Sequence, residues 1–139
     1  MGLFTIGRAT RGGLVTLVVE NRAKTSNLLK VKSGLEEWLP GNLLLIRHQD
    51  GSTSFYTHML KDGVVPQEGD YVERGDLIIV VGNTGNSSGA HLHYRVTSTG
   101  DTEDDSYGGS MPIEFERFGA GGPFCDVPKK GNWYMCTNG

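Results

Sequence analysis

Short apolar runs alternate with turn residues along most of the chain, at the spacing of β-strands. Residues 12–21 are rich in β-branched and aliphatic side chains, and residues 41–60 hold two further runs that are joined through QDGS. A short Gly-containing connection between two such runs is a strong hairpin signal. We therefore expect antiparallel strands in this half of the chain.

The same pattern continues after residue 64. Turn residues recur at 68–70 and 74–76, an apolar strand is expected at 77–81, and a loop of small residues at 82–89 leads to a final strand at 91–96. This segment has no helical periodicity. The pattern predicts an all-β fold.

Two segments depart from this pattern. Residues 33–39, SGLEEWL, predict a single short helical turn. The end of the chain is punctuated by Gly and Pro and holds one expected strand at 111–118. We accordingly divide the chain into a core, residues 1–107, and an irregular C-terminal extension, residues 108–139, that packs on the core.

Length, composition and charge narrow the class of protein. A chain of 139 residues fits one domain with a single core, and its 21 glycines suit many tight turns. The net charge is −3, so nucleic acid is not an expected partner. No apolar run reaches the roughly 18 residues of a membrane span. The arginines in MGLFTIGRATRGG stand where an intact signal peptide would have its apolar core.

Both cysteines, Cys125 and Cys136, fall in the Gly- and Pro-rich tail. In an extracellular protein they would form a disulfide that staples this tail, whereas in a cytosolic protein they would stay reduced. We favour the disulfide. Two cysteines with no histidine nearby do not suggest a zinc ribbon.

Two of the four histidines lie in the sequence GAHLHYRV. On a strand, side chains at i and i+2 project from the same face, so His91 and His93 would point together and Leu92 would point away. Alone, such a pair is more often the polar face of a half-buried strand. A third histidine, His58 in FYTHML, ends an earlier strand-like run. Because imidazole is a common zinc ligand and a proton carrier near neutral pH, these three histidines are candidates for a site.

Four motifs in a fixed order carry a resemblance to a known family. Y-x-H occurs in SFYTHM, G-D-x-V-x-x-G in EGDYVERGD, G-x-T-G-x-S-x-G in VGNTGNSSGA, and H-L-H follows directly. Over residues 5–96 this series resembles the lysostaphin-type zinc metalloendopeptidases, which cleave peptide cross-bridges in bacterial cell walls. No single motif would suffice, but the combination is highly specific.

The resemblance implies a fold and a division of labour. Antiparallel sheets of the lysostaphin-like, duplicated-hybrid-motif type would form a groove with one zinc ion at its floor. His93 would bind the zinc, and His58 and His91 would be catalytic, acting on the attacking water and the oxyanion. An unligated imidazole beside a Lewis-acidic metal suits both tasks. His48 would be a surface residue without a catalytic role.

The resemblance also places a substrate groove beside the metal. The small residues of the loop at 82–89 would let a substrate backbone approach closely. The residues expected along this groove are Tyr56, Asn83, Thr84, Ser87 and Ser88.

One part of the family pattern is missing from this sequence. The family takes two further zinc ligands from an H-x-x-x-D motif before a segment like TIGRATRGGLV, and no histidine precedes His48 here. Asp50 and Asp62 lie in expected turns and do not match the missing positions. Three explanations stay open: the chain is a shortened piece of an enzyme, it is a degenerate binding module, or a second chain or a rearranged metal site completes it.

We expect a zinc metalloendopeptidase-type domain that acts on peptidoglycan peptides, outside the cell or in the cell envelope, with little or no activity as this isolated chain. The alternative is a catalytically degenerate module of the same fold that binds cell-wall peptide or a protein partner. A remote alternative is a histidine phosphocarrier-like domain. The G-D-x-V-x-x-G turn also occurs in carrier domains, and such a phosphocarrier needs two facing histidines, for which His58 and His91 would qualify. A biotinyl or lipoyl carrier is disfavoured, since no lysine lies between Lys61 and Lys129.

Overall fold

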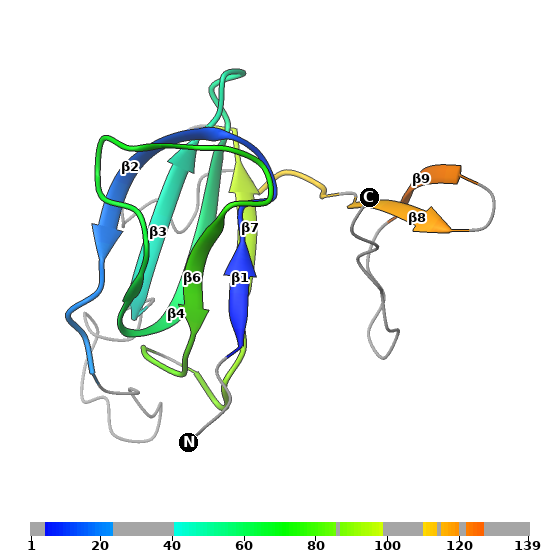
Figure 1. Ribbon diagram of the computed structural model, residues 1–139. Coiled ribbons are helices and arrows are strands. Elements are labelled where there is room, and N and C mark those ends of the chain that lie inside the picture. The colour runs from blue at the N-terminus through cyan, green and yellow to red at the C-terminus, as the bar shows by residue number, and fades with distance from the viewer. Residues whose placement is uncertain are drawn as a thin grey trace.

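Every element that the structure describes is a β-strand (Figure 1). The computed structural model describes residues 5–23, 41–85, 87–98 and 110–113, together with the backbone of residues 115–119 and 122–126. The strands are β1 (Ile6–Arg8), β2 (Gly13–Val19), β3 (Asn42–Arg47), β4 (Thr53–Val64), β5 (Tyr71–Val72), β6 (Leu77–Val81), β7 (His93–Thr97), β8 (Phe115–Gly119) and β9 (Gly122–Asp126).

Seven of these strands form one curled antiparallel sheet. Its order is β1-β6-β4-β3-β2-β5, and β7 also pairs with β4 (Figure 1). The expected hairpin is the β3–β4 pair, in which Leu45 lies opposite Phe55. β8 and β9 form a separate two-stranded sheet. The prediction of an all-β fold of antiparallel strands is therefore confirmed.

β3 is apolar on both of its faces. Leu44 packs in one buried cluster with Tyr56 and Met59, whereas Leu43 and Leu45 pack on the other face in a second cluster. A strand that is buried on both faces carries a continuous apolar run instead of an alternating one. This explains why β3 reads NLLLIR.

The two Gly-Asp turns have the same hydrogen bonds. In the first, the backbone N–H of Asp70 donates to the carbonyl of Gln67 at 3.0 Å, and the Asp70 carboxylate accepts the Gln67 N–H at 2.9 Å. In the second, Asp76 makes both bonds to Glu73, at 3.1 and 2.8 Å. The aspartate thus closes each turn from both sides. These turns bring β5 beside β2 and β6 beside β1.

Two strand boundaries differ from the sequence-based expectation. β4 does not end near His58 but continues to Val64. β7 begins at His93, so His91 lies in the loop before it. The pleat of a single strand therefore does not explain why the two histidines point together.

The expected strand at 111–118 is also placed differently. β8 begins only at Phe115. Ser110 instead forms a bridge with Thr97, and the N–H of Met111 donates to the carbonyl of Val96 at 2.8 Å. The helical turn expected at 33–39 lies outside the described residues. So does Cys136, and the disulfide stays a prediction.

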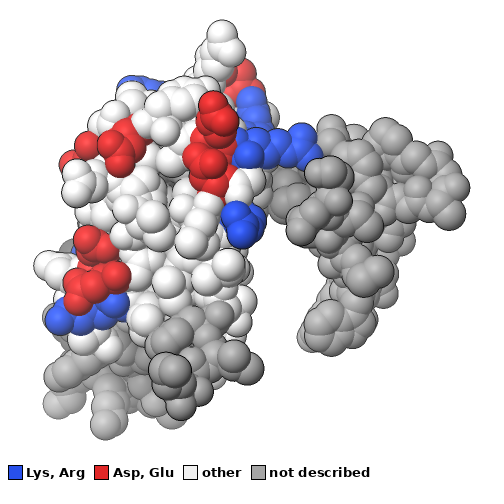
Figure 2. Space-filling view, viewed as in Figure 1, with Lys and Arg blue, Asp and Glu red and all other residues white. Residues whose placement is uncertain are grey.

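Acidic and basic side chains are interspersed on the face shown in Figure 2, around a broad uncharged area. This face has no continuous basic surface among the described residues. Within the same part of the chain, no helix is long and apolar enough to cross a membrane.

Candidate metal centre

His58, His91 and His93 converge at one end of the sheet. The ring centroids of His58 and His91 are 4.9 Å apart, those of His58 and His93 are 5.8 Å apart, and those of His91 and His93 are 6.5 Å apart. Each ring offers a nitrogen, and the three nitrogens lie within 4.8 Å of one another. The structure therefore brings together the three histidines that the sequence singled out.

His58 occupies a bulge within β4. Its neighbours pair normally on β3, with Thr57 opposite Leu43 and Met59 opposite Asn42, so His58 is the extra residue between two register pairs. Its φ is 67°, a left-handed conformation that is uncommon for any residue except glycine. Bulges of this kind re-aim a side chain, and they occur often beside functional sites.

The carbonyl of Thr84 fixes the ring of the buried His58. It lies 2.8 Å from His58 Nδ1 and can only accept, so Nδ1 carries the hydrogen and a neutral ring has its lone pair on Nε2. The Thr84 hydroxyl donates to the carbonyl of Met59 at 2.6 Å and accepts the N–H of Asn42 at 3.0 Å. Gly41 makes this approach possible, because a Cβ there would lie 2.4 Å from the Thr84 backbone.

His91 is oriented by its own loop. Its Nδ1 lies 2.8 Å from the carbonyl of Gly89, which can only accept, so this nitrogen carries the hydrogen. The Ser87 hydroxyl lies 3.2 Å from the same nitrogen and also bonds to the Gly89 carbonyl at 2.9 Å. The small-residue loop thus sets the direction of the His91 ring, although the ring itself is exposed.

His93 stands at the start of β7, opposite Thr57 of β4. Partial burial lowers the pKa of His93, and the nearby His58, His91 and Arg95 lower it further. The neutral ring is therefore favoured near neutral pH. That is the state in which an imidazole binds a metal ion.

Two of the expected groove residues are buried and cannot line an open groove with their side chains. Tyr56 is 0% exposed, because its ring belongs to the core and its hydroxyl accepts the N–H of Thr10 at 3.0 Å. Thr84 is 4% exposed, and its backbone carbonyl accepts a hydrogen bond from the ring of His58. Ser87 is half-buried and Ser88 is exposed. Asn83, also half-buried, lies at the start of the same loop.

His48 is buried, so its interpretation as a surface residue is wrong. Its Nδ1 donates to the carbonyl of Gly12 at 2.8 Å, and its Nε2 lies 2.6 Å from the hydroxyl of Ser54. Ser54 bonds in turn to the Tyr94 hydroxyl at 3.0 Å, and Tyr94 bonds to Thr10 at 2.8 Å. This polar network was not predicted from the sequence. Its signal was the polar residues Thr53, Ser54 and Thr57 at buried positions of β4.

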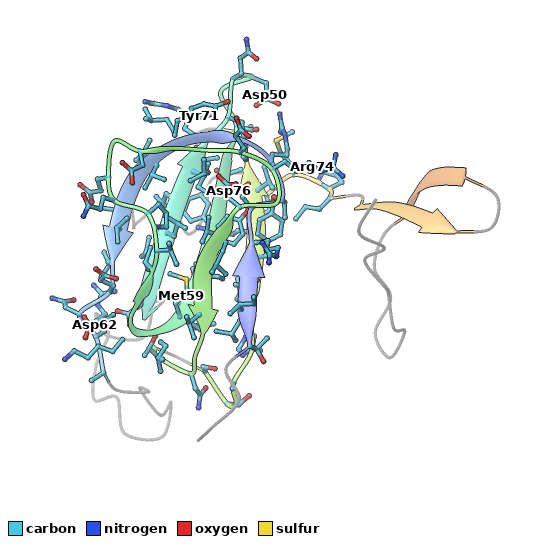
Figure 3. The ribbon with its side chains drawn as sticks, viewed as in Figure 1. Asp50, Met59, Asp62, Tyr71, Arg74 and Asp76 are labelled. Atoms are coloured by element: carbon cyan, nitrogen blue, oxygen red, sulfur yellow. The ribbon has the colours of Figure 1, made fainter. Side chains whose placement is uncertain are left out.

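The donor set fits zinc in number and type, but it is not the set of the family. Three imidazoles and one open position make a known catalytic zinc site. Neither Asp50 nor Asp62 belongs to the cluster of described residues. Figure 3 shows Asp50 at one tip of the sheet, well away from Met59, the residue next to His58. The Asp50 carboxylate instead lies 3.1 Å from the guanidinium of Arg11.

Three histidines that converge at one end of a β-sheet are a donor set for a zinc site. Residues 8–105 match peptidase family M23, and the chain belongs to this family. The DD-carboxypeptidase/endopeptidase Mpg of Neisseria meningitidis is 38% identical over 60 residues, which are 43% of this chain and 13% of that protein. The peptidoglycan DD-endopeptidase ShyA of Vibrio cholerae is 37% identical over 60 residues, which are 43% of this chain and 14% of its own length.

Solved structures have the same fold. The catalytic domain of lysostaphin from Staphylococcus simulans matches with a TM-score of 0.53 and 24% identity, over 74% of this chain and 65% of that one. A zinc-containing peptidase from Vibrio cholerae matches with a TM-score of 0.51 and 26% identity, over 69% of this chain and 24% of that one. The resemblance to lysostaphin-type peptidases is confirmed, and M23 peptidases are zinc enzymes that act on cell-wall peptides.

Proposed function

We propose that this chain is a peptidase domain directed at the peptide part of peptidoglycan, in the cell envelope or outside the cell. The convergence of His58, His91 and His93 carries this proposal. Family membership supports it, and so does the similarity to a peptidoglycan DD-endopeptidase. The same membership favours a peptidase domain over the phosphocarrier alternative.

The roles follow from the chemistry of the residues. A zinc ion, when bound, would polarise the scissile carbonyl and make its water more acidic. His93 would hold the ion. His91 and His58 present Nε2 as the lone-pair nitrogen, so one would take the proton of the attacking water and the other, once protonated, would donate to the tetrahedral oxygen. Ser87, Ser88 and Asn83 would border the substrate on the loop side.

We expect little or no hydrolysis by the isolated 139-residue chain. Within this sequence, only His93 matches a metal ligand of the family's set, and a catalytic zinc ion usually has three protein ligands. The domain would then bind peptidoglycan peptide without cutting it efficiently. The three explanations for the missing ligands stay open: a shortened piece of an enzyme, a degenerate module that binds cell-wall peptide or a protein partner, or a site that a second chain or a rearranged set of ligands completes.

A sedimentation assay with purified peptidoglycan tests this proposal. We expect the chain to co-sediment with intact sacculi and not with sacculi whose stem peptides an amidase has removed. Release of soluble peptides should stay at background. Release above background that is lost in His91→Ala would show that the isolated chain is an active enzyme. Failure to co-sediment, with no release, would contradict the proposed substrate.

A further inference from the structure

We propose that Tyr94 is a positioning residue of the histidine site. Its hydroxyl lies in the middle of a hydrogen-bond network that holds β7, which carries His93, against β4, which carries His58. The members of this hydroxyl network are Thr10, His48, Ser54, Tyr56 and Tyr94. The inference rests on the proposed function for what the site does, but not for the network itself.

The hydroxyl network begins and ends on the backbone of one segment, residues 9–12 between β1 and β2. The N–H of Thr10 donates to the Tyr56 hydroxyl at 3.0 Å, and the carbonyl of Gly12 accepts the Nδ1–H of His48 at 2.8 Å. The network thus ties this segment to β4 and β7 and to the residue that follows β3. Four side-chain bonds connect the two ends: Tyr56 to Thr10 Oγ1 at 3.0 Å, Thr10 Oγ1 to Tyr94 at 2.8 Å, Tyr94 to Ser54 at 3.0 Å, and Ser54 to His48 Nε2 at 2.6 Å.

The direction of each of these bonds is fixed, because a hydroxyl has only one hydrogen to donate. Burial lowers the pKa of His48, so its ring is neutral near neutral pH. Its Nδ1 carries the hydrogen, and Nε2 therefore accepts from Ser54. Ser54 must then accept from Tyr94, and Tyr94 from Thr10 Oγ1. By the same count, Thr10 Oγ1 accepts from Tyr56. All the hydroxyls donate toward His48, and hydrogen bonds aligned in this way strengthen one another.

The two tyrosines of the network lie beside the site histidines. Tyr56 of β4 is opposite Tyr94 of β7, and their ring centroids are 4.9 Å apart. Tyr94 directly follows His93, and Tyr56 precedes His58 by two residues. Tyr56 belongs to the buried cluster of the core, and Tyr94 packs against the same cluster. A displacement of Tyr94 would therefore move His93 relative to His58.

The Tyr94 hydroxyl restrains the end of β7 that carries His93. On its outer edge, β7 bonds to residues 110–111 at its opposite end, at residues 96–97. Near His93, besides the pairing with β4, the hydroxyl of Thr57 donates to the His93 carbonyl at 3.4 Å, which is long for an O–H···O bond. The bonds of Tyr94, at 2.8 and 3.0 Å, are shorter and are thus the stronger side-chain restraint at this end.

Removal of single hydroxyls tests this inference. Tyr94→Phe removes the central hydroxyl and keeps the ring, and Tyr71→Phe, at an exposed tyrosine of β5, is the matched control. Thr10→Val removes a hydroxyl of the network that neither β4 nor β7 carries, whereas Thr10→Ser keeps it. The EDTA-treated protein is studied by NMR at about pH 8, where unperturbed imidazoles are neutral. Thermal unfolding checks that each variant is folded, and Thr10→Val takes the place of Tyr94→Phe if that variant is not.

Two signals are expected from the wild type. The hydroxyl proton of Ser54 should show a scalar coupling to Nε2 of His48, which reports that the network donates toward His48. Nuclear Overhauser effects should connect the ring of His58 with the rings of His91 and His93, whose centroids lie 4.9 and 5.8 Å away.

In Tyr94→Phe and in Thr10→Val we expect loss of the effect between His58 and His93. The effect between His58 and His91 should remain, because His91 lies in the loop before β7 and not on the strand. Tyr71→Phe and Thr10→Ser should keep both effects.

A Tyr94→Phe variant that unfolds at a lower temperature but keeps the effect between His58 and His93 would overturn the inference, because the hydroxyl would then serve stability alone. Absence of that effect in the wild type, its loss in Tyr71→Phe or Thr10→Ser, or a hydrogen on Nε2 of His48 would overturn it as well. None of these signals depends on peptidoglycan. Failure to co-sediment with sacculi therefore contradicts the proposed function alone, and the two proposals fail separately.

Discussion

The four histidines of this chain have different surroundings in the fold. His91 and His93 are exposed, whereas His48 and His58 are buried and bonded to backbone carbonyls. His48 belongs to a hydrogen-bond network that ends in the core. His58 points at the other two histidines. At the scale of single residues, burial and place in the fold distinguish the histidines, because Nδ1 of His48, His58 and His91 each bonds to a backbone carbonyl.

The burial of His48 predicts a pH dependence of stability. Burial lowers the pKa of His48, with Arg11 acting in the same sense and the Gly12 carbonyl and Asp50 acting against it. The unfolded chain thus takes up a proton at a higher pH than the folded chain does. The free energy of unfolding should be unaffected by this group above the ordinary histidine pKa of about 6.5, and should fall as the pH drops below it, by at most about 1.4 kcal/mol per pH unit.

Urea unfolding of the wild type and of His48→Gln at about pH 8 and pH 5 measures this effect. The wild type should lose more stability between the two values than the variant, in which residue 48 does not titrate. His93 adds a fall of the same sign in both proteins, because its pKa is also lowered. Equal losses in the two proteins would show that His48 is protonated as easily in the folded state as in the unfolded one.

At the scale of elements, the bulge at His58 is the point where β4 changes partners. Up to Thr57, β4 pairs with β7, and from Met59 onward it pairs with β6. The loop from β6 to β7 must return across this point, and it does so through Thr84, which bonds to both Met59 and Asn42. The bulge, the loop and the orientation of His58 therefore form one structural unit.

Substitutions of Thr84 test this unit. Thr84→Val keeps the shape of the side chain but leaves the buried N–H of Asn42 without its acceptor, while the carbonyl of Met59 keeps the bond from Asn42 Nδ2 at 3.2 Å. We therefore expect a loss of about 1–3 kcal/mol in the free energy of unfolding. Thr84→Ser keeps the hydroxyl and should lose much less. Nitrogen NMR of the imidazoles should show the Nδ1–H tautomer of His58 in the wild type and in Thr84→Ser, and a mixture in Thr84→Val. An unchanged tautomer in the valine variant would mean that the Thr84 hydroxyl is not needed to hold the Thr84 backbone carbonyl against His58.

At the scale of the whole molecule, residues 110–113 lie along the chain between β7 and β8. Ser110 and Met111 pair with the outer edge of β7, which carries His93. The division of the chain at residue 107 therefore separates the sheet from residues that bond to it. We propose that the sheet domain extends to residue 113 and that β8 and β9 belong to the extension.

Two truncated chains test this boundary. A chain that ends at residue 113 should unfold at the same temperature as the full chain. A chain that ends at residue 107 loses the bonds to Val96 and Thr97, which at about 1 kcal/mol for one net hydrogen bond lowers the thermal midpoint by roughly 4–8 °C. Calorimetry distinguishes the two. A large destabilisation of the longer truncated chain would show that the extension packs on the core, as the sequence analysis expected.

Local signals in the sequence were enough for the elements of the fold. The QDGS hairpin and the two Gly-Asp turns depend on contacts between near neighbours, and the strand at 77–81 has a continuous apolar run; each is present. The all-apolar run of β3 was also readable as a strand, although its two buried faces depend on the side chains that pack against them. The boundaries of β4 and β7 were misplaced, because a bulge and a loop can continue or replace a strand without any change in hydrophobic pattern.

The sequence by itself determined the fold class, the family resemblance and the identity of the three site histidines, because motif order and periodicity are properties of the chain. Only the tertiary structure decided that Tyr56 and Thr84 are buried, that His48 lies inside and that His91 precedes its strand. It also decided how the ring of His58 is oriented. That orientation depends on a hydrogen bond to the carbonyl of Thr84, 26 positions away. A contact of that range exists only once the sheet has formed, and no local pattern encodes it.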